Sequence, residues 1–518
     1  GGLLRTRKGR GGKPFALMMP DLDTIRRHCF VDGAEAETLS SPASPIVLLR
    51  RRSGPDSPRL ADGIAPGLSR LGVMLPYTPL HHLLMARVAR PLVMTSANLS
   101  EEPIVTDNSD AVGRLGRIAD LLMIHDRDIL TRCDDSVLAV DPTGAVPVRR
   151  ARGYAPFPVR LEHPVGSVLA CGAEEKNTFC LARDRDAFLS QHIGDLENAE
   201  TLAHFERTIT LMRRLFRFEP DVLACDMHPE YLSTKYALAL ADDTGLPLVQ
   251  VQHHHAHVAA CLADNDVRGP VIGVALDGTG YGTDGTIWGG EFLAADARSF
   301  ERLAWLEPVR MPGGAAAIRR PWRMAVAHLR TFVPELLGVA SEAEGRAATP
   351  ALLENPGRFA EQGDLRRTGL ASIPQREVQV VLRQLETGLN SPFTSSAGRL
   401  FDAVSAVLGI CAEIRYEAQA AIELEEAALR ADPTDVVVYP VEGACDGPVK
   451  LGPLWAALAD DLRKGAPTER IALRFHRSVA VAVVRTCVAI RSRTDLGRVA
   501  LSGGVFQNRL LMTLLDPP

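Results

Sequence analysis

Several features that the sequence lacks limit the class of protein that it can encode. It has no Cys-x-x-Cys pair: its nine cysteines are scattered over 518 residues and mostly lie in apolar runs, which is typical of reduced thiols in a cytoplasmic protein. The longest apolar run, SVAVAVV at 478–484, is too short to span a bilayer, and no signal peptide opens the chain. We therefore expect a cytoplasmic protein with no membrane partner.

An excess of basic charge is also missing. The formal net charge is −5, so no long-range field attracts the protein to nucleic acid, and a nucleic-acid partner is unlikely on this ground. Any nucleotide must be held by a local site. With 46% hydrophobic and 23% charged residues, the chain suits a globular enzyme of two to four domains.

Two α/β domains are predicted from the order of apolar and polar segments. Residues 1–160 alternate short apolar strands with helical stretches and close with the basic, proline-punctuated run VRRARGYAPFPVRLEHP, which we interpret as an interdomain connection. The second domain is predicted to cover residues 165–518.

Two segments of the second domain have a similar sequence pattern. SVLACGAEEKNTFCLARD at 167–184 and PVIGVALDGTGYGTDGTIWGGEFL at 270–293 each predict a buried strand, a tight turn and a second strand. Duplicated hairpins indicate a two-lobed fold of the actin and sugar-kinase type, with a nucleotide between the lobes. A plain α/β domain with two unrelated hairpins is the alternative.

The stretch VQVQHHHAHVAACLADN, residues 249–265, places four of the 14 histidines within five positions. If a helix begins at these histidines, His253 and His257 lie one turn apart on the same face and can share a metal ion. Asp277 follows a buried strand and is expected at its end, where its carboxylate would be a third ligand. The alternative is a solvated helix start that happens to be rich in histidine.

Two glycine-rich segments favour phosphate binding. Gly278 and Gly280 follow Asp277 and allow backbone N–H groups to approach a phosphate closely. In RVALSGGVFQNRLL, a buried strand runs through Ser502, Gly503 and Gly504 into a predicted helix, whose N-terminus favours an anion. Together these segments predict a nucleotide bridged by a metal.

The N-terminal domain carries a different candidate anion site. Lys8, Arg10 and Lys13 lie beside glycines just before a strand, which suits a triphosphate, although a solvated basic loop is the alternative. Ser96 and Asn98 follow another strand and either bind a nucleotide or form a turn.

Several long motifs identify a resemblance. LGVMLPYTPLHHLL, VMTSANLSEEPIV, RCDDSVL, KNTFCLAR, SQHIGDLENAET, VQHHHAHVA, LDGTGYGTDGTIWGGEF, SSAGRLFDAVSAVLGI and LSGGVFQNRLL resemble, in order, the HypF carbamoyltransferases of NiFe-hydrogenase maturation. The resemblance covers the chain from Lys8 onward. It implies a YrdC-like α/β domain followed by a two-lobed domain similar to the TsaD threonylcarbamoyl-transferases.

The resemblance also implies a reaction. The YrdC-like domain would join ATP and carbamate, derived from carbamoyl phosphate, as carbamoyl adenylate, and the TsaD-like domain would pass the carbamoyl group to the C-terminal cysteine of HypE for cyanide-ligand synthesis. By motif match, Lys8, Arg10, Ser96 and Asn98 would hold ATP, with magnesium expected beside it. His253, His257 and Asp277 would bind a divalent metal, for which iron, zinc and manganese are equally suitable.

The chain departs from the family pattern at both ends. The family also has acylphosphatase and zinc-finger modules, and after SGGVFQN it continues to a PPNDGG-like segment whose Asp is a further metal ligand. We therefore expect a fragment that does not hydrolyse carbamoyl phosphate and whose metal affinity and turnover are impaired. The alternatives are an O-carbamoyltransferase acting on a small hydroxylated molecule, and a nucleotide- and HypE-binding fragment without turnover.

Overall fold

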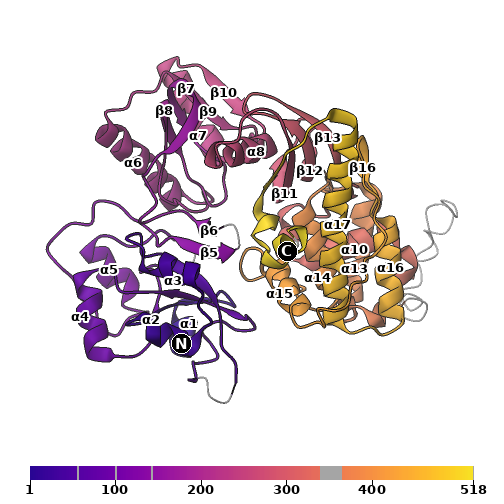
Figure 1. The fold of residues 1–518 in the computed structure, drawn as a ribbon, viewed down its shortest axis with the longest axis horizontal. Coiled ribbons are helices and arrows are strands. Elements are labelled where there is room, and N and C mark those ends of the chain that lie inside the picture. The colour runs from indigo at the N-terminus through magenta and orange to yellow at the C-terminus, as the bar shows by residue number, and fades with distance from the viewer. Residues whose placement is uncertain (55–57, 100–101, 142–143, 339–363, 517–518) are drawn as a thin grey trace. The chain divides into compact units, whose positions relative to one another are not determined.

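The computed structural model describes residues 1–518 except 55–57, 100–101, 142–143, 339–363 and 517–518. The chain divides into two compact units, Gly1–Val251 and Gln252–Pro518, each with its own sheets and core (Figure 1). Across the described ranges, no helix combines the length and the apolar composition needed to cross a membrane.

The first unit opens with a six-stranded mixed sheet in the order β4-β1-β3-β2-β5-β6. Its strands are β1 Ala16–Met18, β2 Ile46–Arg50, β3 Arg70–Met74, β4 Leu92–Met94, β5 Val137–Asp141 and β6 Gly144–Arg149. The helices that accompany it are α1 Gly2–Arg7, α2 Leu22–His28, α3 Gly33–Ser40, α4 Pro79–Val88 and α5 Asn108–Leu115. Phe15, Leu17 and Val73 belong to the buried core of this sheet.

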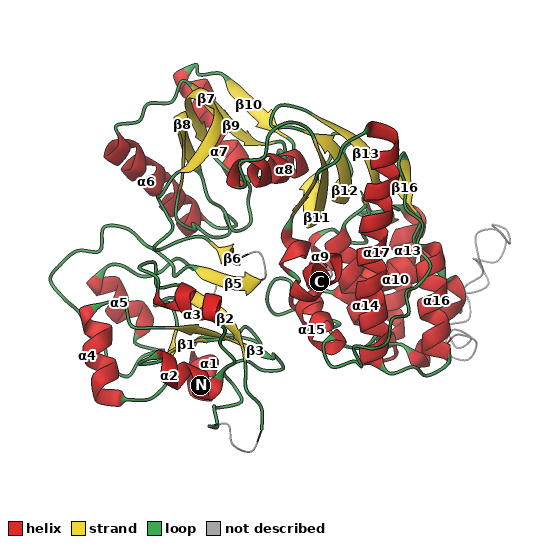
Figure 2. Cartoon of the chain, viewed as in Figure 1, coloured by secondary structure: helices red, strands yellow, loops and turns green. Residues whose placement is uncertain are grey.

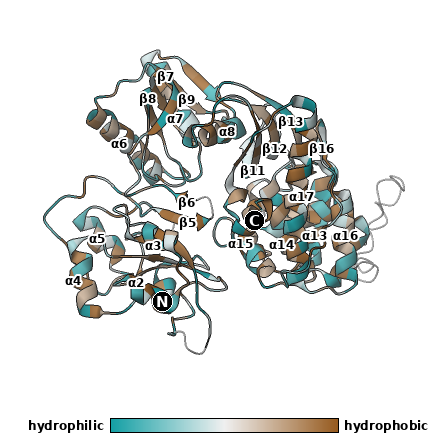
Figure 3. Cartoon of the chain, viewed as in Figure 1, coloured by the Kyte–Doolittle hydropathy of each residue, from teal (hydrophilic) through white to brown (hydrophobic). Residues whose placement is uncertain are grey.

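The first unit also contains a four-stranded sheet in the order β10-β9-β7-β8. Its elements are β7 Val159–Ala170, β8 Cys180–Leu189, α6 Ala199–Phe216, β9 Val222–Asp226, α7 Leu232–Thr244 and β10 Leu248–Val251. Because β7 begins at Val159, this sheet starts inside the run that we predicted to be an interdomain connection. Helix α6 carries both hydrophobic and hydrophilic segments, and its Phe205 and Ile209 pack into the core under the sheet (Figure 3).

The second unit is built on a seven-stranded sheet whose main path is β14-β15-β12-β11-β17. The strands are β11 Val271–Tyr281, β12 Ile287–Ala295, β13 Phe300–Leu306, β14 Val309–Arg310, β15 Phe393–Thr394, β16 Gly447–Val449 and β17 Val499–Ser502. The helices are α8 His253–Asp264, α9 Ala315–Arg319, α10 Pro321–Phe332, α13 Gln375–Thr387, α14 Ala397–Val407, α15 Gln419–Ala428, α16 Gly452–Arg463, α17 Thr468–Thr494 and α18 Arg509–Leu515. Figure 2 shows this unit as a sheet with a large helical bundle.

The two predicted hairpins are confirmed, and they share a topology. In the first unit, β7 pairs antiparallel with β8 and parallel with β9. In the second unit, β11 pairs antiparallel with β12 and parallel with β17. A hairpin with an additional parallel strand thus occurs once in each unit; the sequence predicted the hairpins, and the parallel strands are a finding of the structure.

The core of the second unit lies among its long helices. Trp322 of α10, Phe401 of α14, Trp455 of α16 and Phe475 of α17 are buried together in one apolar cluster. Helix α14 is buried over its whole length, because it lies between α10, α15 and the strand β11. A helix with no exposed face is held rigidly, and its polar residues therefore have fixed positions.

Candidate functional site

Helix α8 begins at the histidines, as the sequence predicted. Gln252 caps it, since its side-chain Oε1 accepts a hydrogen bond from the backbone N–H of His255 at 2.9 Å. The Nε2 of the same side chain donates to the carbonyl of Tyr281 at 3.1 Å. The start of α8 is therefore tied to the end of β11, and His253 and His257 project from adjacent turns of the same helix face.

Asp277 lies inside β11 and not at its end, so our expectation of a strand end was wrong. The pairing of β11 with β12 shifts register between Leu276 and Gly280, and the strand then continues to Tyr281. A bulge of this kind releases residues from the ladder and turns a side chain away from its regular direction. The bulge turns Asp277 toward α8 without breaking the strand.

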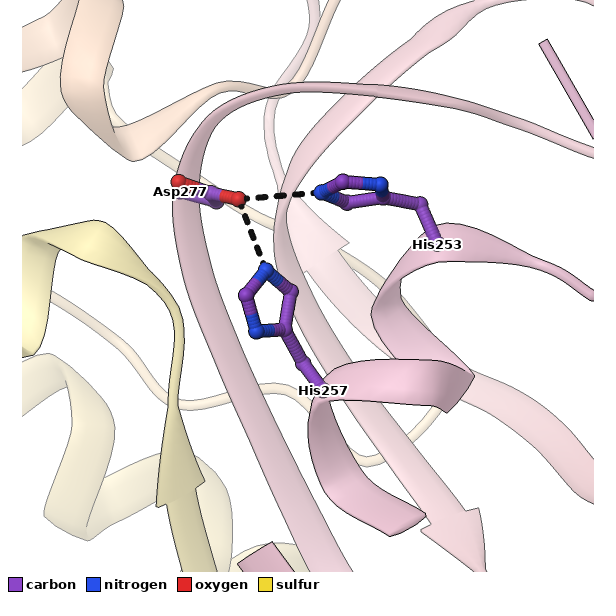
Figure 4. Close-up of side chains that lie close together, drawn as sticks. All are labelled: His253, His257 and Asp277. Atoms are coloured by element: carbon purple, nitrogen blue, oxygen red, sulfur yellow. Dashed lines mark hydrogen bonds and ion pairs between the residues drawn. The ribbon is translucent and has the colours of Figure 1, made fainter. Parts of the chain in front are cut away.

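The three predicted ligand residues meet in space (Figure 4). The Oδ2 atom of Asp277 lies 3.3 Å from Nε2 of His253 and 3.0 Å from Nε2 of His257. One ligand atom from each residue falls within 4.8 Å of the other two. Both imidazoles therefore present the same ring nitrogen to one carboxylate oxygen.

The carboxylate of Asp277 is held in its charged form. Burial would raise the pKa of Asp277, but hydrogen bonds with His253 and His257 outweigh that effect and place the pKa well below its ordinary value. Its other oxygen, Oδ1, accepts the backbone N–H groups of Gly278 at 2.8 Å and Gly504 at 3.2 Å. One oxygen is thus fixed by the backbone, and the other is offered to the two histidines.

This donor set fits a divalent transition metal. Two imidazole nitrogens and one carboxylate oxygen that lie this close together are common ligands of zinc, iron and manganese. His257 is oriented further by Ser502, whose Oγ lies 3.5 Å from the Nδ1 of its ring. Such contacts to the second ring nitrogen select the tautomer that leaves Nε2 available to a metal.

The other two histidines of the cluster serve the fold. His254 is fully buried, and its Nδ1 lies 3.1 Å from Nε2 of Gln252. The Nε2 of His255 lies 2.8 Å from the carbonyl oxygen of Asp296. His255 therefore ties α8 to the residue that follows β12, and His254 is packed beneath the start of the helix.

The glycines near this site are required by close packing. A β-carbon at Gly280 would lie 2.4 Å from Cε1 of His254 and 2.9 Å from Cδ2 of His253. Gly503 has φ of +99°, and a β-carbon there would lie 2.3 Å from the carbonyl oxygen of Leu276. Any larger residue at either position would displace the strand or the ligand histidines.

The segment after β17 differs from our prediction. Ser502, Gly503 and Gly504 do not lead directly into an α-helix: a 3-10 turn, η6 Gly504–Gln507, comes first, and the short helix α18 begins only at Arg509. The backbone N–H of Gly504 is bonded to Asp277 and does not point freely from a helix terminus. The reason is that Gly503 makes the chain turn sharply beside Leu276.

The first unit brings Lys8, Ser96 and Asn98 together. Lys8 ends helix α1, is only 4% exposed, and its Nζ donates to the Ser96 carbonyl at 2.6 Å and to Asn98 Oδ1 at 3.1 Å. The Oγ of Thr95, which we had not singled out, lies 3.3 Å away. Burial, with added repulsion from Arg10 and Lys13, lowers the pKa of Lys8 to about 8.

Arg10 and Lys13 lie on the loop that connects α1 to β1. The Arg10 guanidinium donates to the Lys13 carbonyl at 3.2 Å and to the Pro14 carbonyl at 2.8 Å, and it stacks over the ring of Phe15. Its pKa is lowered by burial and by Arg5 and Arg149. Lys13 is exposed. The alternative interpretation, a freely solvated basic loop, is therefore wrong for Lys8 and Arg10.

The candidate residues form two groups. Lys8, Ser96 and Asn98 belong to the first unit, and Arg10 and Lys13 lie on the adjoining loop. The second group, in the second unit, contains the residues around the bulge of β11 and the end of β17: His253, His257, Asp277, Gly278, Gly280, Ser502, Gly503 and Gly504. Sequence reasoning missed Gln252 and Thr95. Their only signal was proximity to the motifs, since Gln is not a preferred N-cap residue.

Family models of known proteins match the chain in three consecutive segments. Residues 3–151 match the family model "Telomere recombination", which covers the Sua5, YciO and YrdC proteins. Residues 163–264 match "HypF Kae1-like domain", and residues 273–517 match "Carbamoyltransferase, Kae1-like Domain, second subdomain". The YrdC-like domain followed by a two-lobed domain, as predicted from the sequence, is thereby supported.

Two curated relatives align with two thirds or more of the chain. Carbamoyltransferase HypF of Rhizobium leguminosarum bv. viciae is 41% identical over 98% of this chain, which spans 62% of the length of that relative. A carbamoyltransferase HypF homolog of Cupriavidus necator is 38% identical over 67% of this chain and 84% of its own length.

A solved structure is also similar to nearly the whole chain. A full-length HypF, crystallised in a phosphate- and nucleotide-bound form, is 39% identical, with a TM-score of 0.87 over 99% of this chain and 76% of that chain. From the order of its two units, the matched family models and these relatives, the chain belongs to the HypF carbamoyltransferase family.

Proposed function

We propose that this chain carries two consecutive half-reactions of an ATP-dependent carbamoyltransferase. In the first, a carbamate oxygen attacks the α-phosphorus of ATP, which gives carbamoyl adenylate and pyrophosphate. In the second, a thiolate attacks the carbamoyl carbon, the bond from that carbon to the phosphate oxygen breaks, and AMP leaves. The acceptor thiol that we propose is the C-terminal cysteine of HypE.

The first half-reaction is assigned to Lys8 and its neighbours. The Lys8 ammonium is fixed by Ser96 and Asn98 and is partly desolvated, which strengthens its attraction for a phosphate oxygen. Arg10 and Lys13 add positive charge to the same loop. ATP, accompanied by magnesium, is therefore the substrate that this group fits best, because the charge on pyrophosphate must be neutralised as it departs.

The second half-reaction is assigned to the cluster around Asp277. His253, His257 and Asp277 would hold the divalent metal, and a bound cation would neutralise charge on the departing AMP phosphate. The chain itself contributes orientation. Gly278 keeps a side chain away from the bulge, so a phosphate can approach the backbone there, whereas the space beside Gly280 is filled by the rings of His253 and His254.

One observation carries this proposal: the single Asp277 oxygen that both histidines face, fixed by the N–H groups of Gly278 and Gly504 on its other side. Such an arrangement costs folding free energy, because it buries a carboxylate beside two imidazoles. A role in stability alone therefore does not explain it. It is supported by the relative described as phosphate- and nucleotide-bound.

The identity of the acceptor is tested by mass spectrometry. The chain is incubated with ATP and carbamate, and either HypE or a small hydroxylated molecule such as an aminoglycoside is offered. We expect a carbamoyl adduct on the C-terminal cysteine of HypE, and none on HypE whose last residue is changed to serine. Labelling of only the small molecule would favour an O-carbamoyltransferase, and nucleotide binding without any labelling would favour a binding fragment.

A further inference from the structure

A buried arginine lies beside the candidate metal site and is not explained by the fold. Arg399 is on helix α14, nine-tenths buried, and its Nη2 forms an ion pair with Asp402 at 3.1 Å. Its Nε and Nη1 atoms are buried and have no hydrogen-bond partner among the described residues. A guanidinium has five N–H donors, and leaving buried donors unpaired costs about 1–3 kcal/mol for each such group.

Helix α14 is fixed against the bulge that carries Asp277. The side chain of Ser396, at its start, donates to the carbonyls of Asp277 at 2.9 Å and Gly278 at 2.6 Å. The backbones are so close that a β-carbon at Gly398 would lie 2.9 Å from Cα of Gly278. No side chain fits at position 398 between α14 and the bulge, so Arg399 cannot shift relative to Asp277 without moving the site.

The guanidinium lies next to Gly278. A β-carbon at Gly278 would be 3.6 Å from Nη2 of Arg399, which is ordinary van der Waals contact. A group placed against the backbone of Gly278 would therefore touch both Arg399 and the neighbourhood of the metal ligands. An oxyanion in that position would supply charged acceptors to a guanidinium that has unused donors, and this is the pairing that a guanidinium favours most.

We propose that Arg399 binds the phosphate of the nucleotide, as a second cationic contact beside the metal. Asp402 positions it by holding one of its nitrogens. The assignment rests on the proposed function, since it takes the nucleotide of the transfer step as its ligand. The proposal adds to the site a residue that lies more than a hundred sequence positions from the metal ligands. It also explains why a charged pair is buried in an otherwise apolar helix.

The test is binding of AMP, the proposed leaving group, in the presence of saturating Mn²⁺. All chains also carry Lys8→Met, so that nucleotide binding by the first unit is weakened. Arg399→Lys keeps a positive charge for Asp402 but loses donors. Arg399→Gln with Asp402→Asn removes both charges together, so that no unpaired buried charge remains to unfold the protein.

We expect both variants to weaken AMP binding by about tenfold or more, because that is the affinity that one hydrogen bond to a charged group contributes. Mn²⁺ affinity should change less than twofold. The matched control neutralises another half-buried pair of this unit, Arg474→Gln with Asp461→Asn, whose ion pair is 2.7 Å long. Its AMP affinity should be unchanged.

Three results would overturn the proposal. Parallel loss of Mn²⁺ affinity would mean that Arg399 only supports the position of Asp277. Unchanged AMP affinity with a raised KM for HypE would mean that the arginine recognises an acceptor carboxylate instead. Unchanged AMP affinity together with an unchanged KM for HypE would mean that Arg399 has only a structural role.

The binding assay needs no turnover. Loss of AMP binding in a chain that fails to carbamoylate HypE would therefore support the role of Arg399 in nucleotide binding and contradict only the proposed reaction.

Discussion

The backbone N–H of Gly504 donates a hydrogen bond to Oδ1 of Asp277 at 3.2 Å, across 227 positions of sequence. It joins the glycine-rich segment after β17 to the bulge of β11. The carboxylate is thereby held in one orientation, with Oδ2 toward His253 and His257. The glycine segment therefore shapes the candidate metal site directly.

Loss of both histidines should abolish metal binding. We expect His253→Ala with His257→Ala to reduce the bound divalent metal from about one equivalent to near zero, because a single carboxylate is a weak ligand set. The measurement is elemental analysis of the purified protein. His82→Ala with His163→Ala, two exposed histidines elsewhere, is the control; equal metal in both double variants would show that the ligands were misassigned.

A methyl group at Gly280 should damage the same site by crowding. Gly280→Ala places a β-carbon 2.9 Å from Cδ2 of His253, so the ring must move. We expect weaker metal binding and a loss of about 1–3 kcal/mol of unfolding free energy, as for overpacked sites. Gly497→Ala, where a β-carbon meets nothing within 4 Å, should change neither quantity. A Gly280→Ala protein with unaltered metal affinity would argue against this packing.

Lys8 should be essential for adenylation. We expect Lys8→Met to lower carbamate-dependent exchange of pyrophosphate into ATP by about a hundredfold or more, as removal of a preorganised electrostatic contact does in other enzymes. Arg7→Met is the matched control, since Arg7 pairs with the exposed Asp120. If both variants exchange pyrophosphate equally well, Lys8 does not contact the triphosphate.

The pKa of Lys8 predicts a pH dependence. Because that pKa is lowered to about 8, Lys8 is charged at pH 7 and mostly neutral at pH 9, so its attraction for ATP should decline as pH rises. Titration calorimetry should show ATP affinity falling by up to about tenfold over this range. Lys8→Arg, which stays charged, should show no such decline. A flat wild-type profile would contradict the role of Lys8.

The sequence was sufficient for the local features of the site. The spacing of His253 and His257 follows from helical periodicity alone, and the apolar run before Asp277 predicted the strand, although not that the strand continues past Asp277. The two hairpins were predictable because alternation and turn residues are local signals.

Other features depend on tertiary contacts and were not predictable. The bulge at Asp277 is a register shift in the pairing of β11 with β12, which only the folded sheet defines, and the helix expected after Gly504 is delayed by the sharp turn at Gly503. Arg399 and Asp402 have the spacing of an ordinary i, i+3 helical pair, so their sequence alone carries no functional signal. Its significance comes only from full burial beside Gly278.

The most direct test of the two-site account measures both half-reactions in one sample. Wild-type chain and the His253→Ala, His257→Ala variant are each given ATP, carbamate and HypE; carbamate-dependent pyrophosphate exchange and the carbamoyl adduct on HypE are then quantified together. The account predicts that the variant keeps pyrophosphate exchange near the wild-type rate and loses the HypE adduct. Carbamoylation of HypE at the wild-type rate by the variant would contradict it.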